Sequence, residues 1–146
     1  MKRYILWPVL VLLLLAACGT SAAPTAENQD VKPGTVMVDM IYLNHPPVRP
    51  VLTEVDKLLV NYGERVSVAR YDFDTPEGAD FAKAKGLTEH TPLAIFINGS
   101  MEFTVGGRAV KFYSFPQGQG TGMVPDGGWT IEDLQQALDE ATRKSP

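Results

Sequence analysis

This 146-residue chain has few cysteine and histidine residues, the types that most often act as nucleophiles, proton carriers or metal ligands. It has one cysteine, Cys18, and two histidines, His45 and His90. A single cysteine excludes an intramolecular disulfide, a CxxC redox pair and a multi-cysteine zinc site. The two imidazoles, with Asp39 as a further ligand, could hold Zn²⁺ or Cu²⁺, although the long gap between the histidines gives no spacing signal. Metal binding or metal delivery through His45 and His90 is therefore one hypothesis.

Other candidate motifs favour structural roles. The carboxylates Asp72, Asp74, Glu77 and Asp80 cluster in sequence. Pro76 and Lys83 stand where a calcium loop needs ligands, so we expect strand-end and helix-cap roles. The glycine-rich segment 117–122 lacks the lysine of a phosphate loop. The GxSxG and HExxH signatures of hydrolases are also absent, so we expect neither a catalytic residue nor a cofactor.

The first residues indicate export and lipid attachment. Lys2 and Arg3 precede an apolar run of 13 residues, Ile5 to Ala17. A membrane-spanning helix needs about 20 apolar residues, whereas a run of this length suits a signal peptide. The run ends in Leu-Ala-Ala before Cys18, which resembles the lipobox of bacterial lipoproteins. The resemblance implies cleavage before Cys18 and acylation of its thiol and its new amino group. An ordinary signal peptide cut after Ala23 is the alternative.

Composition limits the partners of the mature protein. The chain is 45% hydrophobic and 21% charged, which is typical of a globular domain and unlike a disordered one. Removing Lys2 and Arg3 from the 13 basic residues leaves 11 against 17 acidic ones, a net charge of −6. We expect no nucleic-acid binding and membrane contact only through the lipid, on the extracytoplasmic face of the cell membrane or outer membrane.

Three regions follow from the change in composition along the chain. Residues 1–17 are the expected signal peptide, and residues 18–33 are the expected lipidated cysteine and flexible tether. Residues 34–144 are expected to fold as one α/β domain, with an insertion at about 106–128.

Alternating strands and helices are expected to position these candidate residues. Apolar and alternating segments predict strands at 36–42, 65–73, 93–97, 101–105 and 109–115. Helical spacing predicts helices at 51–62 and 75–85, with Phe81 and Ala84 facing inward, and a last helix after Thr130. The order is β-α-β-α-β-β-(β)-α, which predicts a mixed sheet with helices on both faces.

This order and several local strings resemble the thioredoxin-like fold. The family's first strand ends near Val-Asp-Phe-Trp, and this chain has Val38-Asp39-Met40-Ile41. The family also has Ile-Pro-Thr before an apolar strand and Asn-Gly, and this chain has Thr91-Pro92 before strand 93–97 and Asn98-Gly99. The resemblance spans about residues 34–140 and implies that Pro92 is the family's cis-proline and Asp39 its buried acid.

The resemblance fails where the family performs its chemistry. The Cys-Gly-Pro-Cys motif falls on His45-Pro46-Pro47-Val48, so both thiols are absent. Thiol–disulfide exchange needs a thiolate and a partner sulfur, and oxidoreductase activity is therefore not expected. We expect instead a redox-inactive peptide-binding or scaffold module of the cell envelope. Its groove would be lined by Asn44, His45, Pro46, Pro47, Thr91 and Pro92, and its ligand would be an extended segment of an envelope protein.

Overall fold

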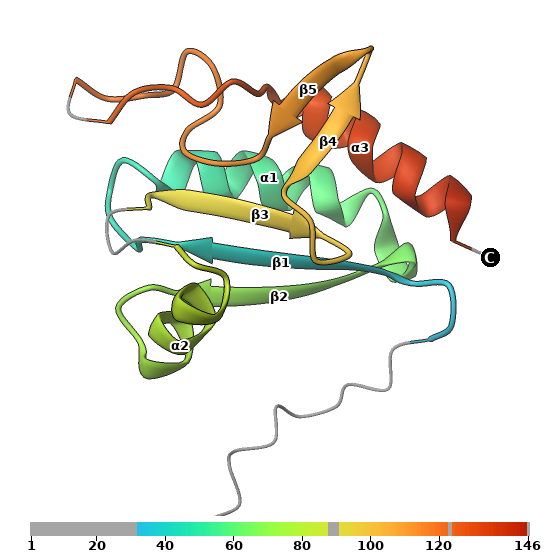
Figure 1. The fold of residues 1–146 in the computed structure, drawn as a ribbon, viewed down its shortest axis with the longest axis horizontal. Helices are drawn as coiled ribbons and strands as arrows, with labels where there is room; N and C mark the ends of the chain where they lie inside the picture. The colour runs from blue at the N-terminus through green and yellow to red at the C-terminus, as the bar shows by residue number, and fades with distance from the viewer. Residues whose placement is uncertain (1–31, 88–90, 123, 146) are drawn as a thin grey trace, which may run out of the picture.

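The computed structural model describes residues 32–87, 91–122 and 124–145. The elements are β1 (Val36–Tyr42), α1 (Arg49–Val60), a 3₁₀ turn (Gly63–Arg65), β2 (Val66–Asp72), α2 (Pro76–Ala84), β3 (Leu93–Ile97), β4 (Glu102–Val105), β5 (Arg108–Lys111) and α3 (Ile131–Lys144) (Figure 1). The predicted signal peptide, Cys18 and most of the tether lie outside these residues. None of the described helices is long and apolar enough to cross a bilayer.

The central sheet has three strands in the order β2-β1-β3. β1 pairs in parallel with β2 and antiparallel with β3, which makes the domain a mixed α/β structure. The strands predicted at 36–42 and 93–97 are confirmed, because continuous apolar residues suit a strand that is covered on both faces. β2 is confirmed to within one residue at each end.

The hairpin after β3 differs from the single sheet that the sequence predicts. β4 and β5 form a separate two-stranded sheet, and the strand predicted at 109–115 ends at Lys111. The following residues return to β3, where Ile95 N–H donates to Phe112 O (3.0 Å) and Ser114 N–H donates to Leu93 O (2.8 Å). Ser114 has a φ of 67°, a left-handed conformation that interrupts an extended strand.

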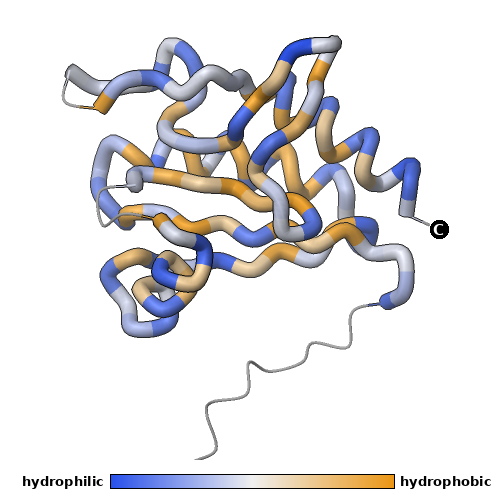
Figure 2. Tube along the Cα trace, in the orientation of Figure 1, coloured by the Kyte–Doolittle hydropathy of each residue, from blue (hydrophilic) through white to orange (hydrophobic). Residues whose placement is uncertain are grey.

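Helices cover both faces of the central sheet, as predicted. α1 and α3 pack on the face that carries Val36, Val38 and Met40. α2 packs on the opposite face, where Ile41 from β1 meets Ala94 and Phe96 from β3. Strand alternation makes this possible, because successive side chains of β1 point to opposite faces. Figure 2 shows hydrophobic residues along β3, whereas hydrophilic and hydrophobic residues alternate along α3.

Local sequence signals set the ends of the helices. The Thr75 side chain accepts from Gly78 N–H (3.1 Å), so α2 begins where Thr75-Pro76 predicts. α1 begins at Arg49, two residues earlier than predicted, because Pro50 lies in the first turn, where its missing N–H costs nothing. The prediction that Ala84 faces inward is wrong. Gly78 and Ala82 are the buried residues of α2, Ala84 is exposed, and Phe81 is half-buried against Tyr71.

α3 is joined to the hairpin by a network around Asp133. Thr130 and Asp133 form the predicted capping box, in which each side chain accepts from the other residue's backbone N–H (2.8 and 3.1 Å). Arg108 from β5 donates to both carboxylate oxygens of Asp133 (2.8 and 2.7 Å). Burial alone raises the pKa of Asp133, but the hydrogen bonds from Arg108 and Thr130 outweigh it and hold that pKa below its ordinary value.

Candidate functional site

The topology opens a crevice at one end of the sheet. β1 and β2 are adjacent and parallel, so their carboxyl ends lie at the same edge. The connection after β1 leads to α1 on one face, and the connection after β2 leads to α2 on the other (Figure 1). Two neighbouring connections that leave to opposite faces create the crevice in which open α/β sheets bind ligands.

A pocket of about 870 Å³ occupies this crevice. Leu43 follows β1, and Phe73 and Asp74 follow β2. The other lining residues come from α2 and the segment after it: Ala79, Ala82, Lys83, Gly86 and Leu87. The side chains of Leu43, Phe73 and Leu87 are only half-buried, so the pocket has apolar walls that remain accessible.

His45 and Asp74 face one another across the mouth of this pocket. His45 Nε2 lies 3.6 Å from Asp74 Oδ2, and the two side chains are 59% and 63% exposed. A contact between two side chains this exposed contributes little to stability, so its position beside the pocket suits contact with a ligand better than support of the fold. Asp74 itself is held by a turn, in which its N–H donates to Asp72 Oδ1 (3.0 Å).

The structure brings together only part of the predicted groove. Leu43 N–H donates to Pro92 O (3.0 Å), so the loop after β1 does lie beside the segment before β3. Asn44, His45, Pro46 and Pro47 are exposed in that loop, and Asn44 Oδ1 accepts from Arg49 Nε (3.3 Å). Thr91 is completely buried, and its hydroxyl lies 3.2 Å from the Tyr113 hydroxyl, so it offers no surface to a ligand.

Pro92 differs from the expectation in two respects. The peptide bonds between described residues are all trans, including Thr91–Pro92, so the cis-proline that the resemblance implies is absent. Pro92 is buried and lines a different pocket, of about 640 Å³, together with Lys111, Tyr113, Ser114 and residues 124–128. Backbone pairing of a peptide beside a cis-proline therefore has no counterpart in this arrangement.

Asp39 lies on the α2 face of β1 and is half-buried rather than buried. Burial raises the pKa of its carboxyl above the ordinary value, and the ammonium of Lys85 partly offsets this effect. Lys85 Nζ lies 4.9 Å from the ring centroid of Phe96, the residue opposite Asp39 on β3. Asp39 does not line the crevice pocket.

The metal hypothesis stays a prediction. His90 lies outside the described residues, as does Cys18. Within residues 32–87, 91–122 and 124–145, no three His, Cys, Asp or Glu side chains are grouped closely enough to hold a metal ion.

The glycine-rich loop is occupied by its own chain. Asp126 accepts from Gly118 N–H (2.9 Å) through one carboxylate oxygen and from Gly120 N–H through the other. These are the backbone amides that a phosphate would need, so the loop in this conformation is a closed turn and offers no anion cradle.

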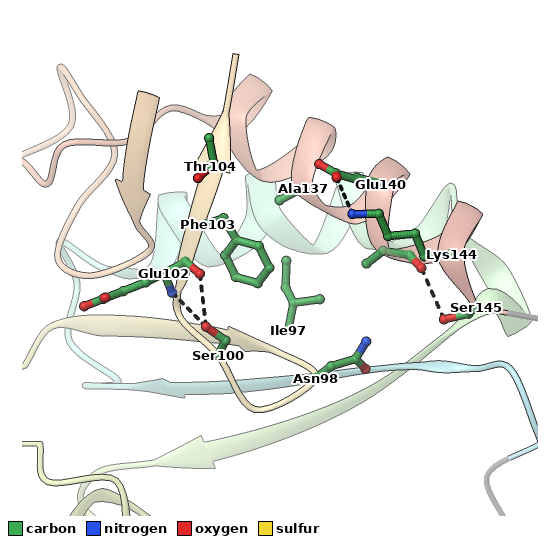
Figure 3. A pocket seen from close by; sticks show the side chains of 11 residues that line it. Ile97, Asn98, Ser100, Glu102, Phe103, Thr104, Ala137, Glu140, Lys144 and Ser145 are labelled. Atoms are coloured by element: carbon green, nitrogen blue, oxygen red, sulfur yellow. Dashed lines mark hydrogen bonds and ion pairs between the residues drawn. The ribbon is translucent and has the colours of Figure 1, made fainter. Parts of the chain in front are cut away.

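A further pocket, of about 600 Å³, separates β4 from α3 (Figure 3). Ile97, Phe103 and Ala137 form its apolar floor. Its rim is already paired within the chain, because Lys144 Nζ lies 2.5 Å from Glu140 Oε1 and Ser100 hydrogen-bonds to the backbone of Glu102. No predicted site residue lines this pocket.

Sequence reasoning missed most of the residues that line the crevice. Phe73 was expected to end a strand, Asp74 to have a strand-end or helix-cap role, and Leu43 fell between a predicted strand and a predicted helix. The signal that could have found them is positional, because all three directly follow the carboxyl ends of parallel strands whose connections leave to opposite faces. No protein-family model, curated protein or solved structure matches this chain.

Proposed function

We propose that the mature chain is a lipid-anchored domain on the extracytoplasmic face of a bacterial membrane, which binds an extended peptide segment of an envelope protein without catalysis. The observation that carries this proposal is the crevice pocket at the carboxyl ends of β1 and β2. The alternation of strands and helices and the helices on both faces of a mixed sheet support the proposal at the level of the mixed α/β class.

The lining favours a peptide as the ligand. Leu43, Phe73 and Leu87 give a half-buried apolar wall that suits a hydrophobic side chain. His45, Asp74 and Lys83 add donors and acceptors at the edge of the same pocket, which suits a polar backbone or a charged neighbour in the peptide. With the only cysteine of the chain at position 18, the binding is reversible and non-covalent.

The crevice lies at the opposite end of the domain from the point where the proposed tether joins it. The chain enters the domain at the amino end of β1, and the crevice lies beyond its carboxyl end (Figure 1). The seven residues of β1 separate the two by about 20 Å, at about 3.3 Å per residue. A tethered domain of this kind presents its pocket to proteins of the surrounding compartment.

Site-directed photo-cross-linking in native membranes tests the proposal. A benzoyl-phenylalanine at Ala79, which lines the pocket, is expected to give a discrete adduct that mass spectrometry identifies as one envelope protein. The matched control is the same residue at Ala84, which is exposed on the same helix and does not line the pocket.

A second pair of variants asks whether the pocket itself is needed. Ala79→Trp fills it and is expected to abolish the interaction, whereas Ala84→Trp is expected to preserve it. The absence of an adduct at Ala79, or the same adducts at both positions, contradicts the proposal.

A further inference from the structure

The crevice pocket holds one acid and one base that do not pair with each other. Asp74 precedes α2, Lys83 stands in its last turn, and both line the pocket. Among the described residues, the only salt-bridge contact of Asp74 is with His45, and Lys83 has none. A helix rises about 1.5 Å per residue, so the seven steps from Pro76 to Lys83 separate the amino end of α2 from Lys83 by about 11 Å.

Lys83 has no structural partner within residues 32–87, 91–122 and 124–145. Its side chain is exposed, and neither a carboxylate nor an aromatic ring of these residues holds its ammonium. Lys85, two residues later, is different, because its Nζ lies 5.4 Å from the ring centroid of Phe81 and 4.9 Å from that of Phe96. The ammonium of Lys83 is therefore available to a ligand.

Asp74 can also take a ligand group. Its Oδ2 lies 3.6 Å from His45 Nε2, which is longer than a hydrogen bond. A carboxylate has two oxygens and about four lone-pair sites, so Asp74 can accept from an ammonium or a guanidinium while it faces His45.

The apolar wall of the same pocket makes this charge arrangement selective. Leu43, Phe73 and Leu87 line the pocket together with Asp74 and Lys83. A ligand that covers the wall also removes water from the two charged groups. Loss of that water costs free energy unless each charge gains a partner of opposite sign. A ligand that supplies both partners is therefore favoured over one that supplies only one.

We propose that the ligand is an extended segment with an apolar residue midway between a basic and an acidic residue that are four positions apart. This inference rests on the peptide-binding function proposed above. The basic residue pairs with Asp74, the acidic residue pairs with Lys83, and the apolar residue contacts Leu43 and Phe73. Side chains at positions i, i+2 and i+4 of an extended chain point to one side and span about 13 Å, close to the spacing along α2.

Three labelled peptides of equal length test the charge requirement. GKSLSEG carries both charges, whereas GKSLSKG and GESLSEG carry two charges of one sign. Fluorescence anisotropy measures their binding to the full-length chain in detergent micelles, and empty micelles measure non-specific partitioning. GKSLSEG is expected to bind about five-fold more tightly than either of the others, because one exposed attraction becomes a repulsion in each of them.

Two charge reversals are expected to redirect this preference. Asp74→Lys should favour GESLSEG, and Lys83→Glu should favour GKSLSKG. The matched controls are Glu77→Lys in the first turn of α2 and Lys57→Glu in the last turn of α1. Neither control residue lines the crevice pocket, so both variants should keep the preference of the parent.

The outcomes separate this inference from the function on which it rests. Equal binding of the three peptides, or a preference that neither Asp74→Lys nor Lys83→Glu changes, would overturn the charge assignment and leave peptide binding standing. Binding of none of the three would contradict the peptide-binding function and the charge assignment together. Ala79→Trp, which fills the pocket, is expected to abolish binding of GKSLSEG, and unchanged binding would overturn the assignment to this crevice.

Discussion

The two faces of the central sheet are built very differently. The face under α1 and α3 carries a large core, in which Phe112, Trp129, Leu134 and Leu138 are almost completely buried. The face under α2 carries a small cluster whose buried members are Ile41, Ala82, Ala94 and Phe96. The second face also holds the half-buried Asp39, and α2 forms one wall of the accessible pocket.

The difference between the two faces suggests that one face stabilises the fold and the other carries the proposed binding surface. Buried apolar area contributes about 25 cal/mol per Å², so most of the hydrophobic stabilisation belongs to the α1/α3 face. The α2 face keeps apolar side chains partly accessible and a carboxyl poorly solvated, features that usually accompany a functional surface. The α1/α3 face therefore carries most of the core, and the α2 side keeps the accessible apolar side chains that the proposed ligand would contact.

The largest expected effect comes from removing the centre of the α1/α3 core. Trp129→Ala is expected to cost about 3–5 kcal/mol, because it leaves a cavity beside Phe112. It also removes the indole N–H that reaches Tyr113 O (3.2 Å) and Ser114 O (3.3 Å). Urea unfolding followed by circular dichroism measures the loss.

The counterpart on the other face is Phe81→Ala. Phe81 is half-buried and stacks on Tyr71 with ring centroids 3.9 Å apart, so we expect a smaller loss of about 1–2 kcal/mol. Equal losses for Trp129→Ala and Phe81→Ala would contradict the division of roles between the faces.

The next effect concerns the Arg108–Asp133 network on the α1/α3 side. Asp133→Ala is expected to cost about 1–2 kcal/mol at pH 7, because the helix cap and the bidentate ion pair are lost together. The folded-state pKa of Asp133 is lowered, so its contribution is present above the unfolded value of 3.8 and disappears as pH falls through the folded pKa. Unfolding measured from pH 7 down to pH 2 should show the variant and the parent converging.

Asp39 is expected to behave in the opposite way. Its folded-state pKa is raised, so ionisation opposes folding and stability falls as pH rises from 3.8 through the folded pKa. Asp39→Asn should therefore be more stable than the parent at pH 7, by under about 1 kcal/mol, with the difference vanishing below pH 3.8. Thermal melts across this range measure it, and a destabilised Asn variant would show that the carboxylate has a stabilising partner.

The smallest expected effect belongs to the mouth of the crevice. His45→Ala is expected to change the unfolding free energy by less than about 0.5 kcal/mol, because the pair with Asp74 is exposed. The same variant should weaken the photo-cross-link at Ala79. A large loss of stability with intact cross-linking would assign His45 to the fold instead of to the ligand.

Much of the secondary structure could be predicted from the sequence, because it depends on local residue patterns. The burial of β1 and β3 follows from their continuous apolar residues, and the start of α2 follows from Thr75-Pro76. The turn at Asn98-Gly99 follows from two residues that tolerate positive φ, here 49° and 82°. Each of these features depends on a few neighbouring residues and their own conformational preferences.

The predictions that proved wrong concern burial, which depends on segments far apart in the sequence. Ala84 looked like a core residue by its type, but the face of α2 that meets the sheet carries Gly78 and Ala82. Thr91 and Pro92 looked like groove residues by their position, but both are buried, and the Thr91 hydroxyl lies against the Tyr113 hydroxyl. Local residue types reveal neither which face of a helix meets the sheet nor which distant segment packs beside a strand.

The sequence by itself determined that no thiol chemistry is available to the folded domain, since its one cysteine stands at position 18. It also determined where β1, β3 and α2 form and where the chain turns at Asn98-Gly99, since these are matters of residue type and spacing. Only the tertiary structure decided where a ligand could bind. The crevice exists because α1 and α2 pack on opposite faces of two parallel neighbours, and that choice is made by the whole core.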